Sequence, residues 1–76
     1  MSLSVKLKQT RQKAFLTQED FASAINVSVA TINRWEKGHS KPNITAMKSI
    51  KAFCEKNNLP FNEIENEWLG YSSEEI

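Results

Sequence analysis

The fold of this chain is decided by residues 17–38, which read TQEDFASAINVSVATINRWEKG. The apolar residues in this stretch recur at helical spacing in two blocks, so we predict helices over residues 18–25 and 29–37. Thr17 comes just before the first block and an acid follows three residues later, which is typical of a capping box. Ser28 is predicted to cap the second helix in the same way. The stretch therefore predicts two short helices joined by a tight turn.

The turn between these helices is Asn26-Val27-Ser28, and its length is typical of two helices that meet at a steep angle. Such a turn needs a residue with positive φ, and we predict that Asn26 supplies it, since Asn tolerates this conformation better than most residues. Ala22 is predicted to lie where the helices cross, because a single methyl group lets the two backbones approach closely. The apolar side chains predicted to fill the core between them are Phe21, Ile25, Val27, Ile32 and Trp35.

The second predicted helix has two unlike faces. On a wheel of about 100° per residue, Ile32 and Trp35 fall on one side. The opposite arc holds Val29, Ala30, Asn33, Arg34 and Lys37. Asn can bond adenine through two hydrogen bonds, Arg can do the same with guanine, and small apolar side chains can touch a thymine methyl group. The arc is therefore a candidate for reading base edges in the DNA major groove. The alternative is a surface helix whose polar face is merely solvated.

Three more helices are predicted outside this stretch, over residues 4–13, 44–56 and 61–69. No segment has the pattern of a strand, and no sequence repeat is visible. Several apolar helical faces in a chain of 76 residues predict a single compact all-α domain. We place this domain at residues 4–70. Residues 1–3 are compatible with a cloning remnant, and residues 71–76 with a flexible tail or linker stub.

Charge is distributed unevenly along the chain. Residues 1–51 carry nine Lys or Arg against three Asp or Glu, a net charge of +6, whereas residues 52–76 carry one against six, a net charge of −5. A basic body favours a polyanionic partner, with the acidic end facing away from it. Charge alone leaves open that both regions are ordinary solvated faces.

Several classes of protein can be set aside. Cys54 is the only cysteine, which excludes an internal disulfide and is typical of a reducing compartment, so we expect a cytoplasmic protein. The only histidine, His39, has no Cys or His partner at ligand spacing, so no metal or cofactor is expected. The chain has no apolar run long enough for a membrane span and no visible signal peptide. It also lacks the nucleophile motifs and Gly-rich phosphate loops that indicate an enzyme.

Taken together, these motifs resemble those of the phage-repressor/Cro-type helix-turn-helix family, also called the xenobiotic-response-element family. The resemblance covers residues 5–69. It depends on Thr17-Gln18 at the start of the first helix of the pair and on Ala22 on its inner side. It also depends on Val27-Ser28 just before the second helix, on Trp35-Glu36-Lys37-Gly38 at the end of that helix, and on the following loop with Pro42. It implies a five-helix, lambda-repressor-like DNA-binding domain whose third helix enters the major groove. It also implies a bacterial or phage transcriptional regulator of the repressor type.

The resemblance assigns roles to individual residues. Base contacts are implied for Ser28, Val29, Ala30, Thr31, Asn33 and Arg34, and phosphate contacts for Gln18, Lys37, His39 and Lys41. Arg11 and Glu36 are implied to form a structural pair, and the helical wheel agrees, since it turns Glu36 inward beside Ile32. Gln18 also opens a helix, where free N–H groups favour an anion. Family habit further implies a homodimer on a two-fold symmetric DNA site.

The sequence departs from the family pattern at three positions. Phe15 and Asn26 stand where Gly is usual, so the end of the first helix is expected to differ. Thr10 replaces an apolar residue, so the first helix is expected to pack less tightly. None of these positions lies on the predicted reading surface.

Two other functions stay open at this point. The same fold can serve as a protein-interaction or antitoxin-like module. Such a module would use the apolar C-terminal side around Phe61, Ile64, Trp68 and Tyr71, although plain core is the interpretation we favour for that stripe. The chain can also be the DNA-targeting domain of a longer protein.

Overall fold

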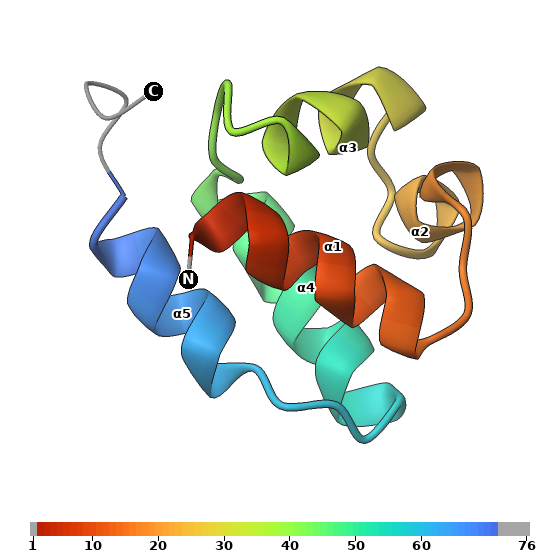
Figure 1. Cartoon of the computed structure of the whole chain (residues 1–76). Coiled ribbons are helices and arrows are strands. Elements are labelled where there is room, and N and C mark those ends of the chain that lie inside the picture. Colours follow the sequence, from red (N-terminus) through yellow and green to blue (C-terminus); the bar gives the residue numbers. More distant parts are fainter. Residues whose placement is uncertain (1, 72–76) are drawn as a thin grey trace.

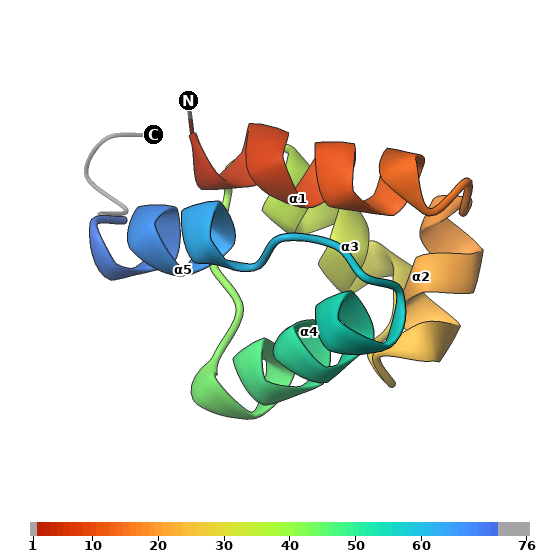
Figure 2. The same cartoon turned by 90° about the horizontal axis from the view of Figure 1, so that it is seen from below.

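Five helices make up the fold: α1 (Leu3–Lys13), α2 (Gln18–Ala24), α3 (Val29–Glu36), α4 (Ile44–Lys56) and α5 (Asn62–Leu69). The computed structural model describes residues 2–71, and that range contains no strand. In Figure 1, α1 crosses in front of α4, α5 lies beside α1, and α2 and α3 close the other side. Figure 2 shows α4 as a separate layer facing α1 and α5. The predicted all-α fold is confirmed, and every predicted helix end lies within one residue of the observed one.

Four of the five helices begin with a side-chain cap. The side-chain oxygens of Ser2, Thr17, Ser28 and Asn43 each accept a hydrogen bond from the backbone N–H of the third residue in their helix. At α2 the carboxylate of Asp20 also accepts from the Thr17 N–H, so the predicted capping box is present. Such caps contribute about 1 kcal/mol each. The local sequence therefore fixes where these helices start.

The first four helices also share one way of ending. Phe15, Asn26, Gly38 and Asn58 adopt positive φ values of 60°, 60°, 80° and 56°. In each case the N–H of the following residue bonds back to a carbonyl in the last helical turn, with N···O distances of 2.8 to 3.2 Å, which is the Schellman pattern. The positive φ predicted for Asn26 is observed. Phe15 takes the same conformation with its side chain 95% exposed, so the difference expected at the end of the first helix is not observed.

All five helices contribute to one core. Phe21 of α2 and Phe53 of α4 pack edge to face, with ring centroids 5.1 Å apart. Cys54 is fully buried, and burial raises the pKa of its thiol to about 11, so it packs as a neutral side chain at neutral pH. Of the five residues predicted to fill the core between α2 and α3, only Val27 is partly exposed. In the C-terminal apolar stripe, Ile64 is buried, while Phe61, Trp68 and Tyr71 are partly buried and pack against the core. The core consists of Leu3, Leu7, Phe21, Ala22, Ile25, Ile32, Trp35, Ala46, Met47, Ile50, Phe53, Cys54 and Ile64.

Leu3, one of the three residues compatible with a cloning remnant, is 4% exposed and belongs to the core. Two sequence-based expectations need correction. Thr10 does not loosen α1, because it is buried and its hydroxyl donates a 2.9 Å hydrogen bond to a backbone carbonyl one turn earlier. Tyr71, which was assigned to a flexible tail, is half-buried and packs against the core. The rest of that predicted tail, residues 72–76, lies outside the described range.

Ala22, which the sequence predicts to lie where α2 and α3 cross, is 4% exposed and belongs to the core. Ala22→Leu is expected to lower the free energy of unfolding by about 1–3 kcal/mol, because the larger side chain overpacks the crossing. Urea denaturation followed by circular dichroism measures this change. Ala24→Leu, on an exposed position of the same helix, is the matched control and is expected to have little effect. Equal effects of the two substitutions would contradict the packing argument.

Candidate nucleic-acid interface

α2 and α3 form the helix-turn-helix unit. The chain bends at Asn26, and the Val27 N–H donates to the Ala22 carbonyl at 2.9 Å. Ile32 and Trp35 bury the inner side of α3 in the core. Figure 1 shows α3 at the outer edge of the fold with α2 beside it. The bend is therefore at the predicted residue, and α3 is anchored by one side only.

The outward face of α3 is open to solvent. Ala30, Arg34 and Lys37 are exposed, and Val29 is 43% exposed. Asn33 is half-buried beside them. This face therefore presents a guanidinium group, an amide and small apolar surfaces on a helix whose inner side is fixed.

The hydroxyl groups of Ser28 and Thr31 take part in the hydrogen bonds that cap the start of α3. The Ser28 Oγ accepts a hydrogen bond from the Thr31 N–H at 3.1 Å, and the two hydroxyl oxygens lie 2.7 Å apart. Thr31 is half-buried and lines a hollow of about 440 Å³ that extends to the start of α4. The structure thus gives both residues a capping role, and their predicted base contacts stay predictions.

Arg11 on α1 and Glu36 at the end of α3 form a bidentate pair. The Arg11 Nε donates to Glu36 Oε2 at 2.8 Å and Nη2 donates to Oε1 at 3.0 Å, while Nη1 donates to the Leu16 carbonyl at 2.9 Å. The two side chains are 12% and 5% exposed. Hydrogen bonding to Glu36 raises the pKa of the Arg11 guanidinium above its usual value. This pair ties the end of α3 to α1.

Glu36 also connects the pair to two candidate DNA-contacting residues. The Gln18 Nε2 donates to Glu36 Oε1 at 3.1 Å, and the Asn33 Nδ2 lies 3.4 Å from Gln18 Oε1. An amide nitrogen carries two hydrogens, so each of these groups can still donate to a second acceptor. The chain of contacts from Arg11 to Asn33 therefore orients both amides while leaving them capacity for a ligand.

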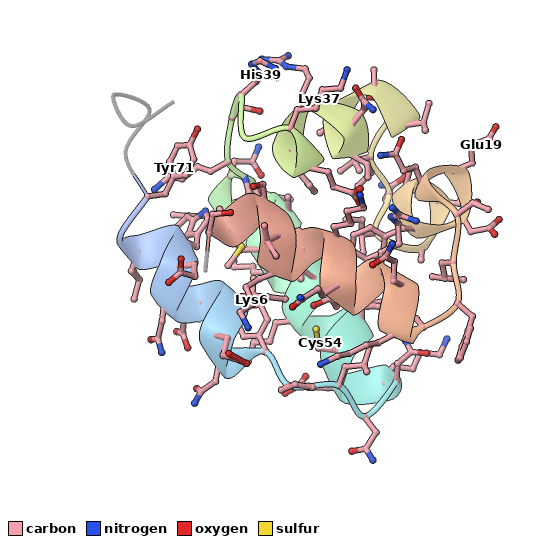
Figure 3. The ribbon with its side chains drawn as sticks, in the orientation of Figure 1. Lys6, Glu19, Lys37, His39, Cys54 and Tyr71 are labelled. Atoms are coloured by element: carbon pink, nitrogen blue, oxygen red, sulfur yellow. The ribbon has the colours of Figure 1, made fainter. Side chains whose placement is uncertain are left out.

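The loop after α3 carries three of the predicted phosphate contacts. Lys37 and His39 are exposed, and Figure 3 shows both side chains at the edge of the molecule formed by α3 and this loop. Lys41 is placed differently. Its Nζ donates to the Trp68 carbonyl at 3.3 Å and lies 4.4 Å from the centre of the Trp68 ring. Its ammonium group is thus turned toward the end of α5, and the predicted phosphate contact of Lys41 stays a prediction.

The sequence analysis missed a contact between the end of α5 and this loop. The Trp68 Nε1 donates to the Pro42 carbonyl at 2.6 Å, and the Tyr71 hydroxyl donates to the Gly38 carbonyl at 3.2 Å. The spacing of Trp68 and Tyr71 indicates that they share a helical side. Nothing in the local sequence indicates which part of the chain that side meets.

Two kinds of feature are absent from residues 2–71. No group of three or more His, Cys, Asp or Glu side chains in this range could hold a metal ion. Likewise, none of the described helices combines the length and the apolar character that crossing a membrane requires. His39 lies in its loop as an exposed side chain and belongs to no such group among the described residues.

A family model described as helix-turn-helix matches residues 7–57 of the chain. The chain belongs to the helix-turn-helix family. The matched range includes the whole α2–α3 unit, so the helix-turn-helix family that the sequence predicts is confirmed.

Two curated relatives share this helix-turn-helix segment. The HTH-type transcriptional activator BcrR of Enterococcus faecalis is 40% identical over 53 residues, which cover 70% of this chain and 26% of that protein. The type II methyltransferase M.SsoII of Shigella sonnei is 32% identical over 65 residues, which cover 82% of this chain and 17% of that protein. The domain thus corresponds to a minor part of each relative. No solved structure matches the chain significantly.

Proposed function

We propose that this helix-turn-helix domain binds double-stranded DNA in a sequence-specific manner, with α3 in the major groove. One observation carries the proposal: α3 buries Ile32 and Trp35 on one side and presents Ala30, Asn33 and Arg34 on the other. The major groove of B-DNA admits an α-helix, and each base pair displays a distinct pattern of donors and acceptors there. An anchored helix with donors on its open side suits this surface.

The residues on the open side of α3 have distinct roles in this proposal. Arg34 donates two hydrogen bonds to a guanine, and Asn33 bonds the edge of an adenine. Val29 and Ala30 in the first helical turn touch thymine methyl groups. The two capping hydroxyl groups at the start of α3 contribute less, because they already bond each other and the backbone.

Phosphate contacts are proposed for Gln18, Lys37 and His39, which flank α3 on the helix-turn-helix side of the fold. Gln18 is the first residue of α2, where backbone N–H groups favour an anion. The hydrogen bond from its side-chain amide to Glu36 fixes the orientation of that amide. Lys37 and His39 are exposed at the end of α3. Such contacts set the register of the protein on the duplex without reading sequence.

We further propose that the domain serves a transcriptional regulator of the repressor type or targets a longer protein to DNA. The lengths of the two relatives favour the second role, because each extends far beyond the matched segment. One of them is named as an activator and the other as a methyltransferase. The sequence-specific binding proposed above is common to both roles.

A selection of preferred sites from a random duplex pool, run at two salt concentrations, tests the binding proposal. We expect one preferred site and a steep loss of affinity with salt. Lys37→Ala is expected to weaken binding to all duplexes about equally. It is also expected to reduce the salt slope, the slope of log affinity against log salt concentration, by about one. Lys56→Ala, at the far end of α4, is the matched control. Absence of salt-dependent duplex binding by the unmodified protein, together with capture of a protein partner, would instead support the interaction module.

We also propose that the domain binds DNA as a two-fold dimer, through a groove lined by α4 and α5. The groove has a volume of about 240 Å³, and its apolar lining includes Ile44 and Leu69, which are 65% and 68% exposed. Lys48 and Lys51 from α4 and Glu65 from α5 line it as well. A two-fold axis pairs the same surface on both copies. The lysines of each copy can therefore face Glu65 of the other, which favours a second copy of this chain as the occupant.

Charge reversal tests this dimer. Glu65→Lys alone, or Lys48→Glu with Lys51→Glu, is expected to weaken cooperative binding to a duplex with two half-sites, because like charges then meet across the axis. Combining all three changes is expected to restore cooperativity. Lys56→Glu, outside the groove, is the control. A triple variant no better than the single one would rule out this pairing.

A further inference from the structure

The loop between α3 and α4 is fixed at two points by the end of α5. The Tyr71 hydroxyl donates to the Gly38 carbonyl at 3.2 Å, at the start of the loop. The Trp68 indole N–H donates to the Pro42 carbonyl at 2.6 Å, near its end. Pro42 is fully buried. Both bonds reach backbone carbonyls, so they set the path of the loop itself.

Lys41 in the loop contacts the same two aromatic residues, Trp68 and Tyr71. Its Nζ lies 4.4 Å from the centre of the Trp68 ring and 5.9 Å from that of Tyr71, and it donates to the Trp68 carbonyl at 3.3 Å. An ammonium group over an aromatic face is attracted by the ring. We call Lys41, Trp68 and Tyr71 the loop clamp.

The loop clamp acts on a segment that leads directly to the DNA-facing side. Gly38, whose carbonyl Tyr71 holds, lies between Lys37 and His39, and the His39 N–H donates to the Arg34 carbonyl at 3.0 Å. A shift of Gly38 therefore moves both side chains proposed to contact phosphate. Figure 3 shows Tyr71 beyond the end of α5 and His39 on the loop at the neighbouring edge of the molecule.

We propose that Trp68 and Tyr71 are positioning residues for DNA binding, which hold the loop after α3 so that Lys37 and His39 meet the phosphate backbone. This inference depends on the proposed function. It assigns a role to residues beyond the segment 7–57 that the family model matches. Lys41 belongs to the loop clamp.

Tyr71→Phe is the decisive test of the inference, because it removes one hydrogen-bond donor and no charge. Trp68→Phe removes the other donor, but it also changes a side chain that lines the groove between α4 and α5. We expect each variant to bind both the preferred site and random duplex about three- to tenfold more weakly, with an unchanged preferred sequence. The salt slope is also expected to fall by up to about one, since a phosphate contact is lost although every charge remains. In a His39→Ala background, Tyr71→Phe is expected to cost less than in the unmodified protein.

Asn66→Ala, on an exposed position of α5, is the control for general effects on this helix, and thermal unfolding shows that each variant is folded. Folded Tyr71→Phe and Trp68→Phe variants with unchanged affinity and salt slope would overturn the inference while leaving the binding proposal intact. A changed base preference would overturn it as well. Absence of duplex binding by the unmodified protein, measured first, would instead remove the proposed function and the inference with it.

Discussion

Replacing Glu36 with alanine is expected to lower the free energy of unfolding by about 3–5 kcal/mol. The change leaves the Arg11 guanidinium, in a side chain only 12% exposed, without the acceptor of two of its hydrogen bonds. It also removes the acceptor of the Gln18 amide. A buried charge without its partner costs far more than the pair contributed, because the desolvation of the remaining group is uncompensated. Urea denaturation monitored by tryptophan fluorescence measures the loss.

Two further variants separate this effect from a general loss of charge. Glu63→Ala removes the exposed partner of Lys6, at 2.7 Å, in the link between α1 and α5. That bond lowers the pKa of the Glu63 carboxyl, but solvent screens it, so a much smaller effect is expected. Arg11→Met combined with Glu36→Leu is expected to be more stable than Glu36→Ala, because no unpaired charge remains. Equal losses of unfolding free energy in Glu36→Ala and Glu63→Ala would show that burial of the Arg11–Glu36 pair does not increase the cost of breaking it.

The parts of the fold that the sequence predicts well are those that neighbouring residues determine. Thr17 and Ser28 cap the helices they precede, because their oxygens reach N–H groups three residues on. Asn26 takes a positive φ because it follows the end of α2 in a Schellman ending, and Asn tolerates this conformation. The inward position of Glu36 follows from helical periodicity alone. Its partner Arg11 came from the family resemblance, since no local rule joins residues 25 positions apart.

The parts that the sequence did not predict depend on contacts between distant segments. Tyr71 falls in the predicted tail because the predicted domain ends at residue 70, whereas its hydroxyl reaches a carbonyl 33 residues away. Lys41 has the exposure and charge of a phosphate ligand, but the face of Trp68 competes for its ammonium group. In both cases sequence spacing does not specify the partner. Thr10 is different, because its hydroxyl bonds the backbone carbonyl one turn earlier within α1, so a polar side chain could be buried there at little cost.

Arg34→Ala is expected to weaken binding to the preferred duplex by about 1–3 kcal/mol and to relax base preference at one position in each half-site. The Arg34 side chain is exposed in the last turn of α3, so the stability of the fold is expected to change little. Selection from a random duplex pool measures the preference, and titration against the selected and a scrambled duplex measures the affinity.

Arg34→Lys is the sharper control, because it keeps the positive charge and loses the planar fork that bonds both acceptors of a guanine. We expect Arg34→Lys to bind random duplex as well as the unmodified protein does, and yet to lose discrimination at the same base pair as Arg34→Ala. Lys37→Ala should show the opposite pattern, with weaker binding everywhere and an unchanged site. Were the selected site identical with and without the Arg34 guanidinium, α3 could not be reading DNA through this residue, and another face of the helix-turn-helix unit would have to lie in the groove.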